Sequence, residues 1–507
     1  MTKSPSSAAG SFPFGKILIA NRGEIAVRVI RAARELGLKT VAVYSDADKN
    51  SPHVLLADEA VHLGESEAKQ SYLVPEKILA ACKRTGADAL HPGFGFLSEN
   101  ADFARACKNA DVTFVGPSPE AMDVMGDKLS ARAAMKKAGV PIVPGSDGAL
   151  KDLAEARRVA KDIGFPVILK AAAGGGGKGM RVARNDKELD SYFELVQREA
   201  LNYFNDGSVF LERYADKPHH IEVQIIADSH GNVCHLFERE CSVQRRHQKV
   251  IEEAPSPYLI GHDDVRARLF AIAVEGAKRI GYVNAGTMEF VMDGSRNFYF
   301  LEMNTRIQVE HPVSEMITGI DLVQEQIRVA AGMKLSFTQD DLVARGHAIE
   351  CRLYAENPHT FLPSPGPVKE LLLPGGPFVR VDASMLAGQE IPLEYDPMIA
   401  KLCAWGRNRE ESMNRMARAL METGVAGCLT NIDFLRRALA DDVFRSGTYT
   451  TGFIAERAEK LANAKMLPSG IATEEEFREL LALLAASEAP AAPRAPEAAS
   501  WWRAGHV

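Results

Sequence analysis

Five polar residues lie two positions apart between residues 302 and 310, and their side chains suit the binding of a metal ion and a phosphate. They are Glu302, Asn304, Arg306, Gln308 and Glu310. Because successive side chains of an extended strand point to opposite faces, the five would share one face. Four neighbouring residues at odd positions are apolar and would form a dry face: Leu301, Met303, Ile307 and Val309. A solvated edge strand would also alternate, but oxygen ligands beside a guanidinium favour a metal–phosphate site.

A further acidic residue, Glu289, stands alone in the apolar segment GTMEF. A buried carboxylate without a partner is costly, so a metal ion or another cation is expected beside it. Together with Glu302 and Asn304 it forms a set of three oxygen ligands, which suits Mg2+ or Mn2+ bound to nucleotide phosphates. Glu310 would stay ionised near Arg306 and could act as a general base. The alternative is a simple Arg–Glu ion pair.

A glycine-rich loop, GGGGKG at 174–179, lies between two expected strands. It matches neither a dinucleotide fingerprint nor a P-loop, because no helix opens after it and no Ser or Thr follows Lys178. A flexible linker is the alternative, but consecutive glycines favour a flap whose backbone closes over nucleotide phosphates. Lys170 ends the apolar segment PVILK, and Lys128 lies at an expected helix start. Each could be a surface lysine, but with the flap they suit phosphate contacts.

Three more features follow this loop. Glu212 in SVFLERY could accept a hydrogen bond from an adenine amino group, although an ordinary strand end fits equally well. The run QRRHQK at 244–249 is a basic island between acidic flanks, which suits a small anion. A solvated charged surface is the alternative for this run. Cys241 lies nearby, but a reduced core thiol is a better interpretation than a nucleophile.

These residues need a scaffold, and the chain alternates in its first part between strand-like and helix-like segments. Strands are expected at 16–20, 40–44, 88–92 and 112–116, and helices at 21–37 and 74–86. Such alternation predicts a parallel sheet covered by helices. From residue 128 strands are expected at 166–170, 180–184, 208–214, 219–228, 232–242 and 286–293, of which the three within 208–242 are of antiparallel type. Helices are expected at 128–138, 186–205 and 264–280. A third region, 345 to about 450, mixes strands at 347–356, 378–384 and 398–406 with helices at 409–422 and 431–440.

The composition limits the class of protein. The chain has 507 residues, and 46% of them are hydrophobic. Its formal net charge of −7 argues against a general nucleic-acid binder. No apolar run approaches the roughly 18 residues of a membrane helix, and the N-terminus lacks a secretory signal. Seven scattered cysteines without a C-x-x-C pair indicate reduced thiols in the cytoplasm. The tail from 466 is expected to carry a short helix and then an Ala/Pro-rich linker, and its last residues include Trp501 and Trp502.

Seven long motifs, in order along the chain, resemble those of biotin carboxylase, the ATP-grasp subunit of biotin-dependent acyl-CoA carboxylases. They are ANRGEIA (20–26), HPGFGFLSEN (91–100), MGDK (125–128), GGGGKGM (174–180), QRRHQKVIEEAP (244–255), EMNTRIQVEHPVSEMITG (302–319) and RGHAIECR (345–352). The resemblance implies an α/β chain, α+β overall. Its parts would be a Rossmann-like N-terminal domain (1–127), an ATP-grasp domain (128–340, with a lid at about 128–215), a C-terminal domain (341–460) and a tail (461–507).

The resemblance also assigns roles to residues of this sequence. It implies ATP contacts by Lys128, Lys170, Gly176, Gly177, Glu212, Arg213, Tyr214, Ala215, His220, Gln244, His247, Glu289 and Glu302. Residues 213–215 would contact adenine through their backbone. The metal ligands would be Glu289, Glu302 and Asn304. The bicarbonate and biotin sites would use Lys249, Arg306, Val309 (through its backbone), Arg352, Phe94 and Asp396, with catalysis by Lys249, Arg306, Glu310 and Arg352. Phe94 stands where the family often has Tyr. Because Val309 is at an odd position, the strand is expected to become a loop after about Thr305.

The mechanism that the resemblance implies is carboxylation of biotin N1 through carboxyphosphate, as the first half-reaction of an acetyl-CoA or propionyl-CoA type carboxylase. ATP, Mg2+ or Mn2+ and bicarbonate would be required. Lys334 and Lys465 are poor matches to a biotinylated lysine. The biotin carrier and the carboxyltransferase are therefore expected on separate chains, and a homodimer is expected. Another ATP-grasp ligase, such as a carbamoyl-phosphate or amino-acid ligase, and a degenerate scaffold without activity are the competing hypotheses.

Overall fold

The computed structural model describes residues 12–171, 179–204, 206–246 and 248–463. The chain divides into two units, Met1–Ala462 and Asn463–Val507, and the helices and strands given below belong to the first, apart from the last residue of α16. Within the described residues, no helix combines the length and the apolar composition needed to cross a membrane.

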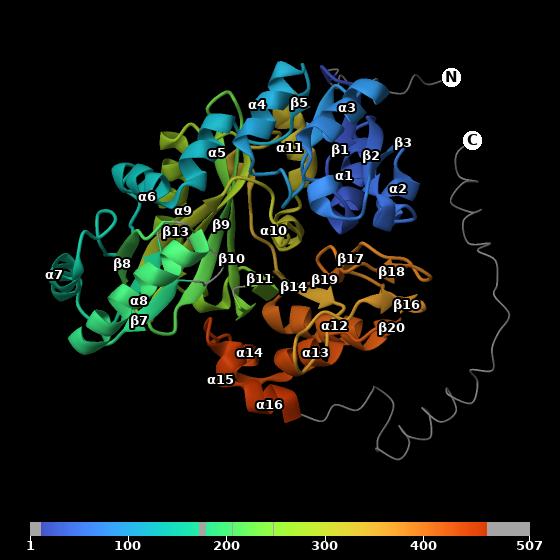
Figure 1. The fold of residues 1–507 in the computed structure, drawn as a ribbon. Coiled ribbons are helices and arrows are strands. Elements are labelled where there is room, and N and C mark those ends of the chain that lie inside the picture. The colour runs from blue at the N-terminus through green and yellow to red at the C-terminus, as the bar shows by residue number, and fades with distance from the viewer. Residues whose placement is uncertain (1–11, 172–178, 205, 247, 464–507) are drawn as a thin grey trace, which may run out of the picture. The chain divides into compact units, whose positions relative to one another are not determined.

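The N-terminal region forms a five-stranded parallel sheet in the order β3-β2-β1-β4-β5, which confirms the predicted Rossmann-like arrangement (Figure 1). Its strands are β1 (Lys16–Ile19), β2 (Lys39–Ser45), β3 (Glu59–Gly64), β4 (Ala89–His91) and β5 (Thr113–Phe114). Its helices are α1 (Gly23–Glu35), α2 (Pro52–Leu56), α3 (Pro75–Thr85), α4 (Ala101–Asn109) and α5 (Pro119–Gly126). Ile17, Leu18 and Ile19 are fully buried, as expected of a parallel strand covered on both faces. The sequence did not predict β3, α2, α4 or α5.

The next region contains a three-stranded antiparallel sheet in the order β7-β6-β8. Its elements are α6 (Lys128–Lys137), α7 (Leu153–Ile163), β6 (Val167–Ala171), β7 (Met180–Ala183), α8 (Asp186–Phe204) and β8 (Val209–Arg213). Val167 and Leu169 are buried in one core with residues of α7 and α8. Because side chains alternate along β6, Lys170 lies on the opposite face, away from this core.

An eight-stranded antiparallel sheet, in the order β13-β12-β9-β10-β11-β14-β19-β17, is the largest element. Its strands are β9 (His219–Ala227), β10 (Val233–Arg245), β11 (Gln248–Ala254), β12 (Asn284–Met292), β13 (Phe298–Asn304), β14 (His347–Tyr354), β17 (Val379–Ala383) and β19 (Met398–Gly406). β11 pairs directly with β14, so the sheet runs without a break across the domain boundary predicted at residue 340. Three helices accompany it: α9 (Asp263–Arg279), α10 (His311–Thr318) and α11 (Leu322–Ala330).

The C-terminal region adds a group of helices and two small strand pairs. The helices are α12 (Arg409–Glu422), α13 (Ile432–Ala440), α14 (Asp442–Ser446), α15 (Phe453–Glu456) and α16 (Ala458–Asn463). Two small antiparallel pairs complete the region: β15 (Gly366–Pro367) with β18 (Glu390–Ile391), and β16 (Glu370–Leu372) with β20 (Gly424–Ala426).

The strand that carries the polar residues differs from its prediction in one respect. Glu289 of β12 lies opposite Glu302, but the next residue, Phe290, lies opposite Phe300, so Leu301 is the extra residue of a β-bulge. The bulge moves Leu301 out of the dry face, where it was predicted, and leaves it 37% exposed. The prediction for Leu301 is therefore wrong. β13 ends at Asn304, which confirms that the alternation stops there.

Candidate active site

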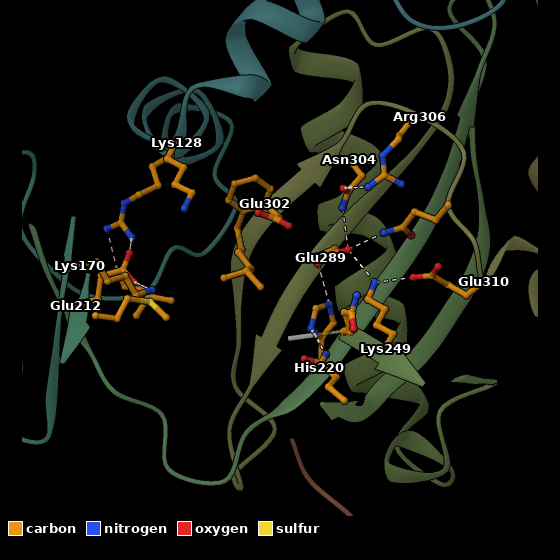
Figure 2. A pocket seen from close by; sticks show the side chains of 18 of the residues that line it. Lys128, Lys170, Glu212, His220, Lys249, Glu289, Glu302, Asn304, Arg306 and Glu310 are labelled. Atoms are coloured by element: carbon orange, nitrogen blue, oxygen red, sulfur yellow. Dashed lines mark hydrogen bonds and ion pairs between the residues drawn. The ribbon is translucent and has the colours of Figure 1, made fainter. Parts of the chain in front are cut away.

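A cavity of about 440 Å³ lies between the three-stranded and the eight-stranded sheets, and most of the predicted site residues line it (Figure 2). They are Lys128, Lys170, Glu212, His220, Gln244, Lys249, Glu289, Glu302, Asn304, Arg306, Val309, Glu310 and Arg352. Gly176, Gly177 and His247 lie outside the described residues. Residues predicted from segments far apart in the sequence therefore meet around one cavity.

On the side of the cavity formed by α6 and β6, one carboxylate holds two cations. The Oε2 atom of Glu212 lies 2.5 Å from Nζ of Lys170, and its Oε1 atom accepts a hydrogen bond from Arg132. A contact between Glu212 and an adenine amino group would therefore have to share an oxygen with one of these cations. Arg132 was not predicted, although it follows Lys128 by four residues and so lies on the same face of the helix.

The segment 213–215 was predicted to contact adenine through its backbone. The N–H of Arg213 donates to the carbonyl of Pro144 (2.7 Å), and the N–H of Tyr214 donates to the carbonyl of Pro166 (2.9 Å). Both N–H groups are thus used within the protein. The segment's carbonyls and the N–H of Ala215 remain as the candidates for reading the edge of a base.

At the centre of the cavity, Lys249 contacts three carboxylates. Its Nζ atom lies 2.5 Å from Glu222, 2.9 Å from Glu289 and 2.6 Å from Glu310. Burial alone would lower the pKa of Lys249, but the three carboxylates outweigh it and raise that pKa well above its usual value. Lys249 is therefore a fixed positive charge, available to an anion that enters the cavity.

Glu289 was expected to have a metal ion or another cation beside it, and Lys249 is such a cation. Besides Lys249, its carboxylate accepts hydrogen bonds from Asn304 (2.8 Å) and Gln308 (2.6 Å) and lies 2.9 Å from Nε2 of His220. Burial would raise the pKa of Glu289, but Lys249 and His220 lower it well below its usual range. The carboxylate is thus ionised, as a metal ligand must be.

Glu302 lies directly opposite Glu289 in the register of β12 and β13. Among the described residues it has no hydrogen bond or ion pair, and its side chain opens onto the cavity. Its pKa is raised, by the pocket walls that exclude water and by the negative charge of Glu289. Two facing carboxylates, one without a cation, fit a hard divalent ion. Asn304 could join them through the second lone pair of its Oδ1 atom, which accepts a hydrogen bond from Arg306 (2.8 Å).

Glu310 follows the strand and precedes α10 directly. Its carboxylate shares Lys249 with Glu289 and lies 3.1 Å from Nη2 of Arg352. Burial would raise the pKa of Glu310, but Lys249, Arg352 and Arg239 hold it well below its usual range. Glu310 is therefore ionised, the form that a general base requires.

The alternative left open for Glu310, a simple ion pair with Arg306, is not formed between these two described residues. Nε of Arg306 instead donates to Glu99 (2.9 Å), which belongs to the motif HPGFGFLSEN. Glu99 was not predicted as a site residue. The pairing connects the N-terminal region to the loop that follows β13.

A second cavity of about 470 Å³ adjoins the first, and both Phe94 and Asp396 line it, as predicted for the biotin site. Three residues line both cavities: Arg306, Val309 and Arg352. These three residues therefore form the boundary across which a group made in one cavity could pass to the other.

Arg239, which no local pattern in the sequence indicated, lies fully buried beneath the first cavity. All five N–H groups of its guanidinium donate hydrogen bonds, to Glu222 (2.5 Å), Gln224 (2.6 Å), Gln308 (2.6 Å), Thr287 (3.1 Å) and Ser314 (3.1 Å). Glu222 and Gln308 in turn contact Lys249 and Glu289. Arg239 thus fixes the groups behind the site.

Cys241 is also fully buried, and burial raises the pKa of its thiol well above the usual value. The thiolate form is therefore scarce at neutral pH. This agrees with the prediction of a core thiol.

Three family models cover most of the chain. They are the biotin carboxylase N-terminal domain (residues 13–122), the carbamoyl-phosphate synthase L chain ATP-binding domain (127–338) and the biotin carboxylase C-terminal domain (350–456). The ATP-binding model alone would also suit a carbamoyl-phosphate ligase, but biotin carboxylase 1 of Bacillus subtilis is 53% identical over 441 residues, which are 87% of this chain and 98% of that protein. The chain belongs to the biotin carboxylase family. As a biotin carboxylase it is an ATP-dependent ligase that carboxylates biotin.

Other relatives of this biotin carboxylase belong to different carboxylases. A pyruvate carboxylase subunit of Methanothermobacter thermautotrophicus is 51% identical over 87% of this chain and 90% of that protein. The biotin carboxylase domain dimer of Hydrogenobacter thermophilus 2-oxoglutarate carboxylase, solved in complex with MgADP, ADP and bicarbonate, is 47% identical, with a TM-score of 0.84 over 90% of this chain and all of that one. These matches confirm the predicted fold and family, and they leave the final acceptor open.

Proposed function

We propose that the chain carboxylates N1 of a biotin carried by a separate carrier protein, with ATP and bicarbonate, as the first half-reaction of an acyl-CoA carboxylase. The observation that supports this proposal is the pair of adjoining cavities that share Arg306, Val309 and Arg352. One cavity would hold ATP and bicarbonate, and the other would hold biotin. An acetyl-CoA or propionyl-CoA type acceptor is proposed from the family resemblance; pyruvate or 2-oxoglutarate is the alternative that the relatives support.

Lys128 and Lys170 would contact the phosphates of ATP, with the backbone of Gly176 and Gly177 closing over them. Glu289 and Glu302 would hold Mg2+ or Mn2+. When bound, the metal neutralises charge on the phosphates, which is the main requirement of phosphoryl transfer. The complex of the H. thermophilus domain with MgADP and bicarbonate supports this assignment by similarity.

Bicarbonate would bind between Lys249, Arg306 and the backbone N–H of Val309, within reach of Glu310. Lys249 now pairs with Glu310 at 2.6 Å, which makes that carboxylate a weak base. Once bicarbonate shares Lys249, Glu310 becomes more basic and can take the bicarbonate proton. The resulting carbonate oxygen attacks the γ-phosphorus, the bond to ADP breaks, and carboxyphosphate forms.

Carboxyphosphate would then break down to carbon dioxide and phosphate. The phosphate takes the proton from biotin N1, and N1 attacks the carbon dioxide to give carboxybiotin. Arg352 would stabilise the negative charge that develops on the ureido oxygen. Its side chain is 10% exposed and is paired with Glu252 at 2.6 Å and with Glu310, so it is held at the boundary of the two cavities. Phe94 and Asp396 would line the pocket for the biotin ring.

We also propose that the biotin carrier and the carboxyltransferase are separate chains, that the protein is a homodimer and that it acts in the cytoplasm. The dimeric H. thermophilus domain supports the dimer, and seven free cysteines suit a reducing compartment. Lys334 follows α11 within the carboxylase body, where a carrier domain is not expected. Streptavidin blotting should find no biotin on the purified chain, and light scattering should give twice the mass of one chain.

ATP hydrolysis tests the proposal. The wild type should hydrolyse ATP only with bicarbonate, and free biotin should increase the rate. Glu310→Gln should reduce the rate by about 10²–10⁴-fold, the usual contribution of a general base. Arg352→Ala should abolish the stimulation by biotin more strongly than the hydrolysis without biotin. A wild type that biotin does not stimulate would overturn the proposal.

A further inference from the structure

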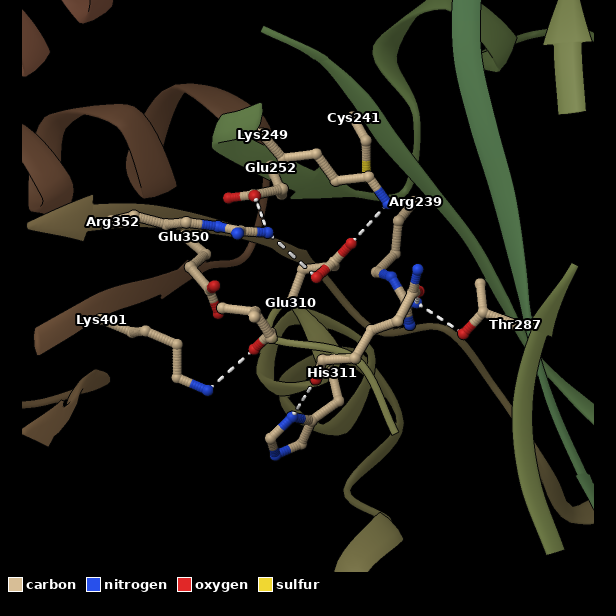
Figure 3. A network of polar contacts seen from close by, with 12 residues as sticks. Arg239, Cys241, Lys249, Glu252, Thr287, Glu310, His311, Glu350, Arg352 and Lys401 are labelled. Carbon is tan, nitrogen blue, oxygen red and sulfur yellow. Dashed lines mark hydrogen bonds and ion pairs between the residues drawn. The ribbon is translucent and has the colours of Figure 1, made fainter. Parts of the chain in front are cut away.

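The loop from Gln308 to Glu310 is held from behind by two buried side chains (Figure 3). Nζ of Lys401 donates to the carbonyl of Val309 at 2.8 Å. Nδ1 of His311 lies 2.8 Å from the carbonyl of Gln308. Both consecutive peptide groups of the loop are therefore fixed through their carbonyl oxygens.

The two contacts also determine where the N–H groups of these peptides point. In a trans peptide the C=O and the N–H point in opposite directions. The N–H of Val309 therefore points away from His311, and the N–H of Glu310 points away from Lys401. Val309 and Glu310 both line the first cavity. The contact from Lys401 thus fixes the peptide group from which the Glu310 side chain starts.

Lys401 is an unusual residue for its position. It lies in the apolar strand β19 and is fully buried, although a buried charge is costly unless it is paired. In the sheet it lies directly opposite Arg352 on one side and Asp382 on the other, so these three side chains share a face. Glu24, from α1, lies 3.1 Å from its Nζ atom.

These neighbours keep Lys401 charged. Burial alone would lower the pKa of Lys401, but Glu24, Glu350 and Asp382 outweigh it and raise the pKa. A hydrogen bond from a charged donor is stronger than one from a neutral donor. The Val309 carbonyl is thus held by a protonated amine that is anchored in the C-terminal and N-terminal regions.

We propose that Lys401 is a positioning residue of the bicarbonate site. It fixes the Val309–Glu310 peptide group, and through it the start of the Glu310 side chain, which is the proposed general base for bicarbonate. The inference rests on the proposed function, because it assigns bicarbonate to this loop. It makes the C-terminal region, which contributes Arg352 to the cavity, responsible also for the shape of the bicarbonate site.

The test is Lys401→Met, which keeps the length of the side chain and removes the donor. The KM for bicarbonate, measured as ATP hydrolysis without biotin, should rise about tenfold or more, as expected from the loss of a charged hydrogen bond. The Kd for ADP should be unchanged. If Lys401 contributed only to stability, the substitution would not change the KM for bicarbonate separately from the Kd for ADP.

Arg409→Met is the matched control. Arg409 is also a largely buried cation of the C-terminal region, paired with Glu253 at 2.7 Å, but it lines neither cavity. Its variant should lose stability and keep the KM for bicarbonate. An unchanged KM in Lys401→Met, or an equal rise in both variants, would overturn the inference.

If Lys401→Met does not fold, Glu24→Gln and Glu24→Gln/Lys401→Met form a second pair. Removing both charges avoids leaving Glu24 buried without its cation. The double variant should have at least a tenfold higher KM for bicarbonate than Glu24→Gln alone; equal values would overturn the inference. Hydrolysis that does not depend on bicarbonate in the wild type would instead refute the proposed function, so the two failures are distinguishable.

Discussion

Replacing Arg239 by Lys tests whether the guanidinium beneath the site acts through its hydrogen bonds or through its charge. The positive charge remains, so Glu222 keeps a cationic neighbour. An ammonium group has three N–H donors, whereas Arg239 uses five. At least two of the five acceptors would lose their donor. Each buried polar group left unsatisfied costs about 1–3 kcal/mol, so Arg239→Lys should cost about 2–6 kcal/mol.

Thermal unfolding gives the measurement. For a cooperative unit the size of Met1–Ala462, roughly 1 °C is lost per kcal/mol, so the midpoint should fall by at least about 2 °C. The KM for bicarbonate should also rise, because Gln308 and Glu222 would no longer be held against Glu289 and Lys249.

The matched control is Arg266→Lys. Arg266 makes three hydrogen bonds, to Glu238 twice and to Asp263 once, and its side chain is 20% exposed. A lysine can supply three donors, so this variant should lose less than about 1 kcal/mol. If Arg239→Lys unfolds at the same temperature as Arg266→Lys, the five-donor argument is refuted.

Two further substitutions probe single carboxylates. Glu302→Gln should raise the Mg2+ concentration for half-maximal activity about tenfold or more. It should not lower the unfolding midpoint without metal, because it removes the like charge facing Glu289. A lower midpoint would contradict the assigned geometry. Glu253 has a pKa lowered from 4.5 to about 2: burial opposes the shift, but Arg409 and His347 outweigh it. Its carboxylate therefore contributes stability above about pH 4.5, and this stability is lost as the pH falls through about 2. At about 1.4 kcal/mol per pH unit of pKa shift, the contribution is about 3 kcal/mol. The midpoints of wild type and Glu253→Gln should differ at pH 7 and converge towards pH 3; a constant difference would contradict the ion pairing.

Much of the site could be predicted from the sequence because its residues lie in local patterns. A lone acid in an apolar segment marked Glu289, and spacing by two marked Glu302 and Asn304. The same reasoning, applied to the lone lysine of MIAKLCAWG, would have marked Lys401, which is fully buried.

Other features depend on partners that are distant in the sequence. The bulge at Leu301 is set by the register against β12, which the composition of β13 does not determine. The partners of Arg239 extend from Glu222 to Ser314, and Arg306 pairs with Glu99, 207 residues away. Such contacts follow from the topology of the sheets, not from local spacing.

The most direct test of the central claim is the transfer of labelled carbon from bicarbonate to biotin. Wild-type protein, Mg2+, ATP and labelled bicarbonate should convert biotin, free or on a carrier protein, to labelled carboxybiotin, with one ADP formed per carboxyl group transferred at saturating biotin. Omitting ATP or introducing Glu310→Gln should remove the label. ATP hydrolysis that depends on bicarbonate but leaves biotin unlabelled would contradict the account.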